Sequence, residues 1–302
     1  MRAFLLLLSR LRWLRRWAET SKISRRVSSR FIAGETLGDV LAAGRRINGE
    51  GIALTIDHLG ENVTSLAEAE LSRDVYLQAL DAIAENRING NVSIKLTQFG
   101  IDISEDACRA NVEELVKRAK DQNNFVRLDM ESSAYTDRTL RLVEALHREY
   151  GAVGAVIQAY LRRSEQDVEN LCRRGIRVRL CKGAYLEPPE AAFQDKSEVD
   201  HNYGRLMRIL LAAGTYPAIA THDQNIIEQT KQFARSRHIA PASFEFQMLY
   251  GIRRDLQRQL VDQGYRLRLY VPFGKAWYPY FMRRLAERPA NVLFLVRNIF
   301  RA

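Results

Sequence analysis

The stretch that decides the fold runs from residue 92 to residue 130 and reads VSIKLTQFGIDISEDACRANVEELVKRAKDQNNFVRLDM. Its two ends, Val92–Leu96 and Phe125–Met130, are short and rich in large apolar residues, which is typical of buried strands. Between them, Glu105–Lys120 places apolar residues at helical spacing among charged ones, so we expect an amphipathic helix. A helix that joins two buried strands predicts a parallel strand pair with a crossover connection.

The same alternation of strand and helix recurs along the chain from residue 51. We expect eight strands, at Ile52–Asp57, Val92–Leu96, Phe125–Met130, Ala155–Ala159, Ile176–Cys181, Ala218–Thr221, Ser243–Met248 and Arg266–Val271. The helical stretches include Ser65–Glu85, Glu105–Lys120, Thr136–Tyr150, Val199–Ala213 and Ile226–Ser236. Eight units fit a closed barrel better than an open sheet, and no G-x-G-x-x-G follows the first strand, which disfavours a Rossmann fold. The sequence therefore predicts an α/β protein, a (β/α)8 TIM-type barrel over residues 51–302, with a basic N-terminal helical extension over residues 1–50.

Polar side chains stand at the end of every predicted strand. They are Asp57, Lys95, Asp129, Gln158, Arg179, Thr221 with His222, Gln247 and Tyr270. In a (β/α)8 barrel the active site forms at this end of the strands, so these residues are the first candidates for chemistry. Polar residues also fill layers inside some barrels, and that structural interpretation stays open for each of them singly.

The positive charge of the chain is concentrated at its N-terminus. Residues 1–50 hold 11 Lys or Arg against 4 Asp or Glu, which is +7 of the total net charge of +10. The remainder lacks the basic stripe that a duplex-binding protein needs, so we expect no nucleic-acid partner. With 3 scattered Cys, 5 His and no H-E-x-x-H, we expect no metal centre.

The first residues combine Leu and Trp with many Arg. The apolar run at Phe4–Leu8 is far shorter than the roughly 20 residues that span a bilayer. A basic helix with Leu and Trp can lie in the interface of an anionic membrane. It can equally pack on the barrel or on a partner, and the sequence leaves both interpretations open.

Near the C-terminus, Tyr280, Arg283, Arg284 and Glu287 recur at helical spacing and share one face. Two guanidiniums on one face suit a carboxylate ligand, because each offers a planar fork of donors. The alternative is a solvated ion pair on the last helix, since such pairs are common.

Several motifs in the same order resemble those of proline dehydrogenases. They are Ser93–Gln98, Val126–Glu131, Val178–Tyr185, Ala220–Asp223, Phe244–Gly251, Tyr270–Gly274 and the segment from Tyr280 to Glu287. The resemblance begins near residue 52 and implies a distorted barrel that binds FAD and oxidises L-proline to pyrroline-5-carboxylate. The chain is too short for the aldehyde dehydrogenase module of the larger members, so we expect a monofunctional enzyme.

The resemblance also implies roles for individual residues. Substrate would contact Lys95, Arg283, Arg284, Tyr270, Tyr280, Leu249, Ala184 and Tyr185, with the two arginines on the proline carboxylate. The cofactor would contact Met130, Gln158, Arg179, Lys182, Gly183, Ala184, Thr221 and His222. Asp129 and Arg179 would be catalytic, Asp129 by orienting basic groups and Arg179 by lying near the flavin N5.

Family members pass their electrons to a membrane quinone. We therefore expect a cytoplasmic enzyme, with peripheral contact at the inner face of the membrane through residues 1–25 as an open expectation. Two alternatives remain at this point: a barrel lyase in which Lys95 or Lys182 forms a Schiff base, and a membrane-surface adaptor without turnover.

Overall fold

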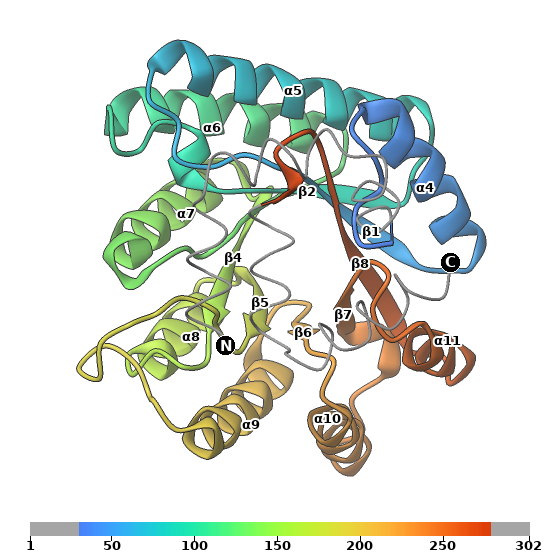
Figure 1. Ribbon diagram of the computed structural model, residues 1–302. Coiled ribbons are helices and arrows are strands. Elements are labelled where there is room, and N and C mark those ends of the chain that lie inside the picture. Colours follow the sequence, from blue (N-terminus) through green and yellow to red (C-terminus); the bar gives the residue numbers. More distant parts are fainter. Residues whose placement is uncertain (1–29, 279–302) are drawn as a thin grey trace, which may run out of the picture.

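A computed structural model describes residues 30–278 and shows a closed barrel of eight parallel strands (Figure 1). The strands follow the chain order around the barrel: β1 (Ala53–His58), β2 (Gly90–Ile94), β3 (Val126–Leu128), β4 (Val153–Gln158), β5 (Arg177–Cys181), β6 (Ala218–Ala220), β7 (Glu245–Leu249) and β8 (Arg266–Phe273). β8 closes the barrel by pairing with β1, in a register that sets Thr55 opposite Tyr270. The predicted barrel and its eight strands are confirmed.

Helices ring the outside of the barrel (Figure 1). They are α4 (Leu37–Gly49), α5 (Leu66–Glu85), α6 (Glu105–Asp121), α7 (Thr136–Tyr150), α8 (Ser164–Arg173), α9 (Lys196–Ala213), α10 (Gln224–Ser236) and α11 (Arg254–Asp262). Short 3-10 turns lie at Leu96–Gln98, Ser133–Tyr135 and Pro241–Ser243. The five predicted helical stretches are confirmed, and α8 and α11 are additional.

Local sequence explains where these helices begin. Five of them start at a residue whose side-chain oxygen accepts a bond from a backbone N–H of the first turn: Thr36, Ser65, Ser104, Asp195 and Asp223. Such caps satisfy N–H groups that lack a partner within the helix. Gly151 ends α7 with a φ of 73°, a left-handed conformation that glycine adopts without steric cost.

The apolar core lies between the strands and the helices, while the interior of the barrel is largely polar. Leu54, Ile56, Val92 and Ile94 are buried on the outer, helix-facing side of β1 and β2. The alternating positions carry polar groups into the barrel, where Thr55 donates to Asn91 over 2.6 Å. Because successive residues of a strand point to opposite faces, one short strand serves both the core and the site.

Helix α4 packs against β1 and β8 through buried Val40, Ala43, Gly44 and Ile47. The division of the chain at residue 50 stays a prediction. Among residues 30–278, none of the helices has both the length and the apolar character that a bilayer crossing requires.

Candidate active site

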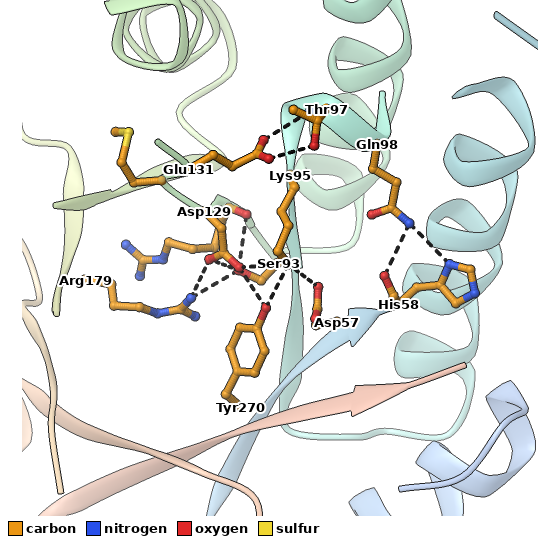
Figure 2. A network of polar contacts seen from close by, with 12 residues as sticks. Asp57, His58, Ser93, Lys95, Thr97, Gln98, Asp129, Glu131, Arg179 and Tyr270 are labelled. Carbon is orange, nitrogen blue, oxygen red and sulfur yellow. Dashed lines mark hydrogen bonds and ion pairs between the residues drawn. The ribbon is translucent and has the colours of Figure 1, made fainter. Parts of the chain in front are cut away.

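Four of the predicted site residues meet at the carboxyl ends of the strands, as Figure 2 shows. Asp129, which follows β3, is their common partner: its Oδ1 lies 2.7 Å from Arg179 Nη1 and its Oδ2 lies 2.7 Å from the Tyr270 hydroxyl. Lys95 Nζ lies 3.2 Å from that same hydroxyl and 3.6 Å from Asp129 Oδ2. We call Lys95, Asp129, Arg179 and Tyr270 the strand-end network.

Two further residues contact this network, although neither was given a role by the resemblance and only Asp57 was named as a strand-end candidate. Asp57, at the end of β1, accepts from Lys95 Nζ over 2.9 Å. Ser93, on β2, donates to Asp129 Oδ1 over 2.6 Å and accepts from Arg179 Nη1 over 3.1 Å. Ser93 precedes Lys95 by two positions, so the alternation of a strand already places both on the inner face.

The pKa values of the two carboxylates in this cluster are shifted in opposite directions. Burial acts to raise the pKa of Asp129, but the charges of Arg179 and Lys95, with bonds from Ser93 and Tyr270, bring it below its ordinary value. For Asp57 burial prevails over Lys95, so its pKa is raised. Asp129 is therefore the permanent anion that holds the basic groups together.

Lys95 is the ammonium between these carboxylates. Burial acts to lower its pKa, but Asp57, Tyr270 and Asp129 outweigh that effect, and the pKa lies well above its ordinary value. A Schiff base requires a neutral amine, whereas the contacts of Lys95 favour its charged form. Lys182 also contacts two carboxylates, Asp200 and Asp223. Both arrangements argue against the lyase alternative.

The guanidinium of Arg179 forms hydrogen bonds through two of its three nitrogens. Nε donates to Gln247 Oε1 over 2.6 Å, and Nη1 donates to Asp129 and Ser93. Among residues 30–278 its buried Nη2 has no hydrogen-bond partner, and the same holds for Oε1 of buried Gln158. A buried donor and a buried acceptor without partners are costly unless a ligand satisfies them.

The remaining predicted cofactor residues lie on the same rim. Gln158 Nε2 donates to the Met130 carbonyl over 3.1 Å, which joins β4 to the end of β3. The Leu249 N–H donates to His222 Nε2 over 3.0 Å, so the ring proton of His222 stands on Nδ1. Thr221 Oγ1 accepts from the Asp223 N–H at the start of α10.

Gly183 has a structural requirement that the sequence did not reveal. Its φ is 106°, and an added Cβ would lie 2.3 Å from Cδ1 of the Tyr160 ring. The contact with Tyr160 and the backbone conformation both disfavour a residue with a Cβ at this position. The approach of this backbone to the cofactor stays a prediction. Ala184 and Tyr185 follow it in the loop between β5 and α9.

Tyr280, Arg283 and Arg284, with Glu287, lie outside the described residues. Their roles stay predictions.

The comparisons with known proteins agree with this geometry. A family model described as "Proline dehydrogenase" matches residues 40–297. The chain is 40% identical to "Proline dehydrogenase 2" of Bacillus subtilis over 298 residues, 99% of this chain and 98% of the relative. The chain belongs to the proline dehydrogenase family. It is 41% identical to the "Proline dehydrogenase" of Deinococcus radiodurans over 280 residues, 91% of this chain and 90% of that one.

A solved structure with the same fold is proline utilization A (PutA) from Bdellovibrio bacteriovorus, inactivated by N-propargylglycine. The TM-score is 0.81 at 28% identity, and the match covers 87% of this chain but 32% of that one. This proline dehydrogenase family member is therefore an oxidoreductase with a TIM-type barrel, and the adaptor alternative is set aside.

Proposed function

We propose that this chain oxidises L-proline to pyrroline-5-carboxylate with bound FAD and passes the electrons to a membrane quinone. The observation that carries the proposal is the strand-end network, in which Asp129 fixes Lys95, Arg179 and Tyr270 at the carboxyl ends of the strands. Membership of the proline dehydrogenase family supplies the substrate class.

FAD fits the residues that the structure describes. The unpartnered Nη2 of Arg179 is a donor and the unpartnered Oε1 of Gln158 is an acceptor. A flavin ring carries groups of both kinds, so it would satisfy both atoms. Met130, Lys182, Gly183, Ala184, Thr221 and His222 would hold the rest of the cofactor. When bound, FAD supplies the acceptor for the hydride that leaves proline C5.

Positive charges would bind the carboxylate of the substrate, and apolar side chains would enclose its ring. Arg283 and Arg284 would bind its carboxylate, and Lys95 would add a third positive charge. The apolar surfaces of Tyr270, Tyr280, Leu249, Ala184 and Tyr185 would enclose the ring, because a small apolar ring is recognised by shape. Orientation and charge are thus the contributions of the chain itself.

The proposal is tested by the product. Purified protein with an artificial electron-accepting dye is given L-proline, and o-aminobenzaldehyde is added to trap any cyclic imine. We expect dye reduction and the coloured adduct to appear together, in proportion. Dye reduction without the adduct, or neither signal, would contradict the proposed reaction.

The rate should rise with pH. A secondary amine, like the Lys side chain with a pKa of about 10.4, is mostly protonated at neutral pH and must lose its proton before hydride leaves. The pKa of Lys95 is raised and that of Asp129 is lowered, so both keep their charge from pH 7 to 10. We therefore expect kcat/KM to increase about tenfold per pH unit in this range. A flat profile would show that the substrate amine is not the titrating group.

The membrane part of the proposal rests on the basic Leu- and Trp-bearing N-terminus. Deleting residues 1–25 should weaken binding to anionic vesicles and spare dye-coupled proline oxidation, because dye reduction needs no membrane. Co-sedimentation with vesicles measures the first and the dye assay the second. Equal vesicle binding by the truncated protein would rule out this segment as the membrane contact.

A further inference from the structure

Gln247 on β7 lies inside the barrel directly behind Arg179, and none of the roles assigned above falls on it. Its Oε1 accepts from Arg179 Nε over 2.6 Å, and its Nε2 donates to Glu245 Oε1 over 2.5 Å. All three side chains are buried. We propose that Gln247 is a positioning residue that holds the Arg179 guanidinium with its Nη2 edge open to the flavin, and that Glu245 fixes the orientation of the Gln247 amide.

The amide of Gln247 has one favourable orientation. Its oxygen faces the cationic Nε–H of Arg179, and its NH2 group faces the carboxylate of Glu245. Turning the amide over would set a donor against a donor and an acceptor against an acceptor. In a buried site each such mismatch leaves charged groups unsatisfied. Gln247 is therefore a fixed support for Arg179.

Glu245 is itself held by Arg268 on the neighbouring strand β8. Arg268 Nε donates to Glu245 Oε1 over 2.7 Å, and Arg268 Nη1 donates to the Leu54 carbonyl over 3.0 Å and to Asn91 Oδ1 over 3.1 Å. Burial acts to raise the pKa of Glu245, but Arg268 outweighs it and the pKa lies below its ordinary value. Glu245 is therefore an anion, and a chain of bonds connects Arg179 to the backbone of β1.

The bond to Gln247 determines which nitrogen of the Arg179 guanidinium remains available to a ligand. Gln247 occupies Nε, and Asp129 and Ser93 occupy Nη1, which leaves the buried Nη2 without a partner in the described part of the chain. Gln247 is also neutral, so it orients the guanidinium without cancelling its charge. A cation beside a flavin stabilises the anionic reduced form and so raises the reduction potential. This step rests on the proposed FAD cofactor.

The test compares Gln247→Met and Gln247→Glu with the unchanged protein. The methionine removes both hydrogen bonds at similar size, whereas the glutamate keeps the acceptor and adds a negative charge beside Arg179. The flavin midpoint potential, measured without proline, should become more negative in Gln247→Met and more negative still in Gln247→Glu. In Gln247→Met, kcat should fall about tenfold while KM for proline stays within about twofold.

Asn202→Leu is the matched control. Asn202 is a buried amide on α9, outside the barrel, that donates to the Ala159 carbonyl over 2.7 Å and to Ser164 Oγ over 3.0 Å. Losing it should lower thermal stability and leave the potential unchanged. An unchanged potential in both Gln247 variants, or an equal shift in Asn202→Leu, would overturn the positioning role. If Gln247→Met does not fold, Gln247→Glu decides.

A flavin-free measurement separates this inference from the proposed function. The NMR signal of the Arg179 Nε–H is assigned by its absence in Arg179→Met. In the apoprotein this hydrogen should exchange slowly with solvent, and it should exchange faster in Gln247→Met. Unchanged exchange would overturn the positioning role whether or not the protein binds FAD. A protein that takes up no flavin but shows the accelerated exchange would instead contradict the proposed cofactor.

Discussion

Replacing Asp129 with asparagine should lower kcat/KM for L-proline by at least about 100-fold and destabilise the fold by about 3 to 5 kcal/mol. Asp129 lies within 2.7 Å of Arg179 Nη1 and of the Tyr270 hydroxyl, and its side chain is 13% exposed. An asparagine would leave the buried guanidinium without its counter-ion and would turn an NH2 group toward a donor. The measurements are steady-state kinetics and denaturant unfolding at pH 7.

Asp129 and its asparagine variant are compared at pH 7 because of the direction in which the pKa of Asp129 is shifted. The pKa of Asp129 is lowered in the folded protein. Its stabilising contribution is therefore complete above the ordinary aspartate pKa of about 3.9 and is lost as the pH falls through the folded value. At pH 7 the full difference between aspartate and asparagine is measured.

Asp57→Asn is the matched control for this change. Asp57 also pairs with Lys95 and is buried, but its pKa is raised and its Oδ2 has no partner among the residues that the structure describes. Neutralising it removes a poorly compensated charge, and Lys95 keeps Asp129 at 3.6 Å. We expect a loss of stability of no more than about 1 to 2 kcal/mol. Equal effects of the two substitutions would contradict the central position given to Asp129.

Replacing Arg283 and Arg284 together with methionine should raise KM for L-proline by about 100-fold or more. Each charge-assisted bond to a buried carboxylate is worth roughly 1.5 to 3 kcal/mol, and two guanidiniums are removed. Flavin content should not change, because the described residues proposed to hold FAD are untouched. Substrate titration of the dye-coupled rate gives KM, and the visible spectrum gives the flavin content.

Arg297→Met is the control for general loss of positive charge in the same segment, and it should leave KM unchanged. Pyrrolidine, which has the proline ring without the carboxylate, provides a second comparison. If the two arginines bind the carboxylate, the double variant and the unchanged protein should oxidise pyrrolidine at similar rates. An unchanged KM for proline in the double variant would rule out the proposed carboxylate site.

The fold was largely predictable because its periodicities are strong. The segment of β4 is a short, mostly apolar run that contrasts with the charged, periodic stretch of α7. Helix α4 is harder to recognise, because two of its four buried positions are Ala43 and Gly44, which carry little hydrophobic signal. The sequence therefore predicts only a basic helical extension in this region.

The sequence was sufficient to predict which side chains lie at the carboxyl ends of the strands. A period of two places Lys95 and Tyr270 on the inner face, and their meeting follows from the barrel. The sequence does not specify which partner a long side chain reaches, so the pairing of Lys95 with Asp57 became visible only in the structure. For Gly183 the contact with Tyr160 depends on loop geometry, which has no periodic signal.

The central claim is that a flavin bound over the strand-end network takes its electrons from L-proline. The most direct measurement is the visible absorbance of the purified protein before and after L-proline is added without oxygen. We predict a yellow protein whose flavin band bleaches on addition of L-proline and returns when an electron acceptor is supplied. A protein that is colourless and takes up no FAD, or a flavin band that L-proline leaves unchanged, would contradict the account.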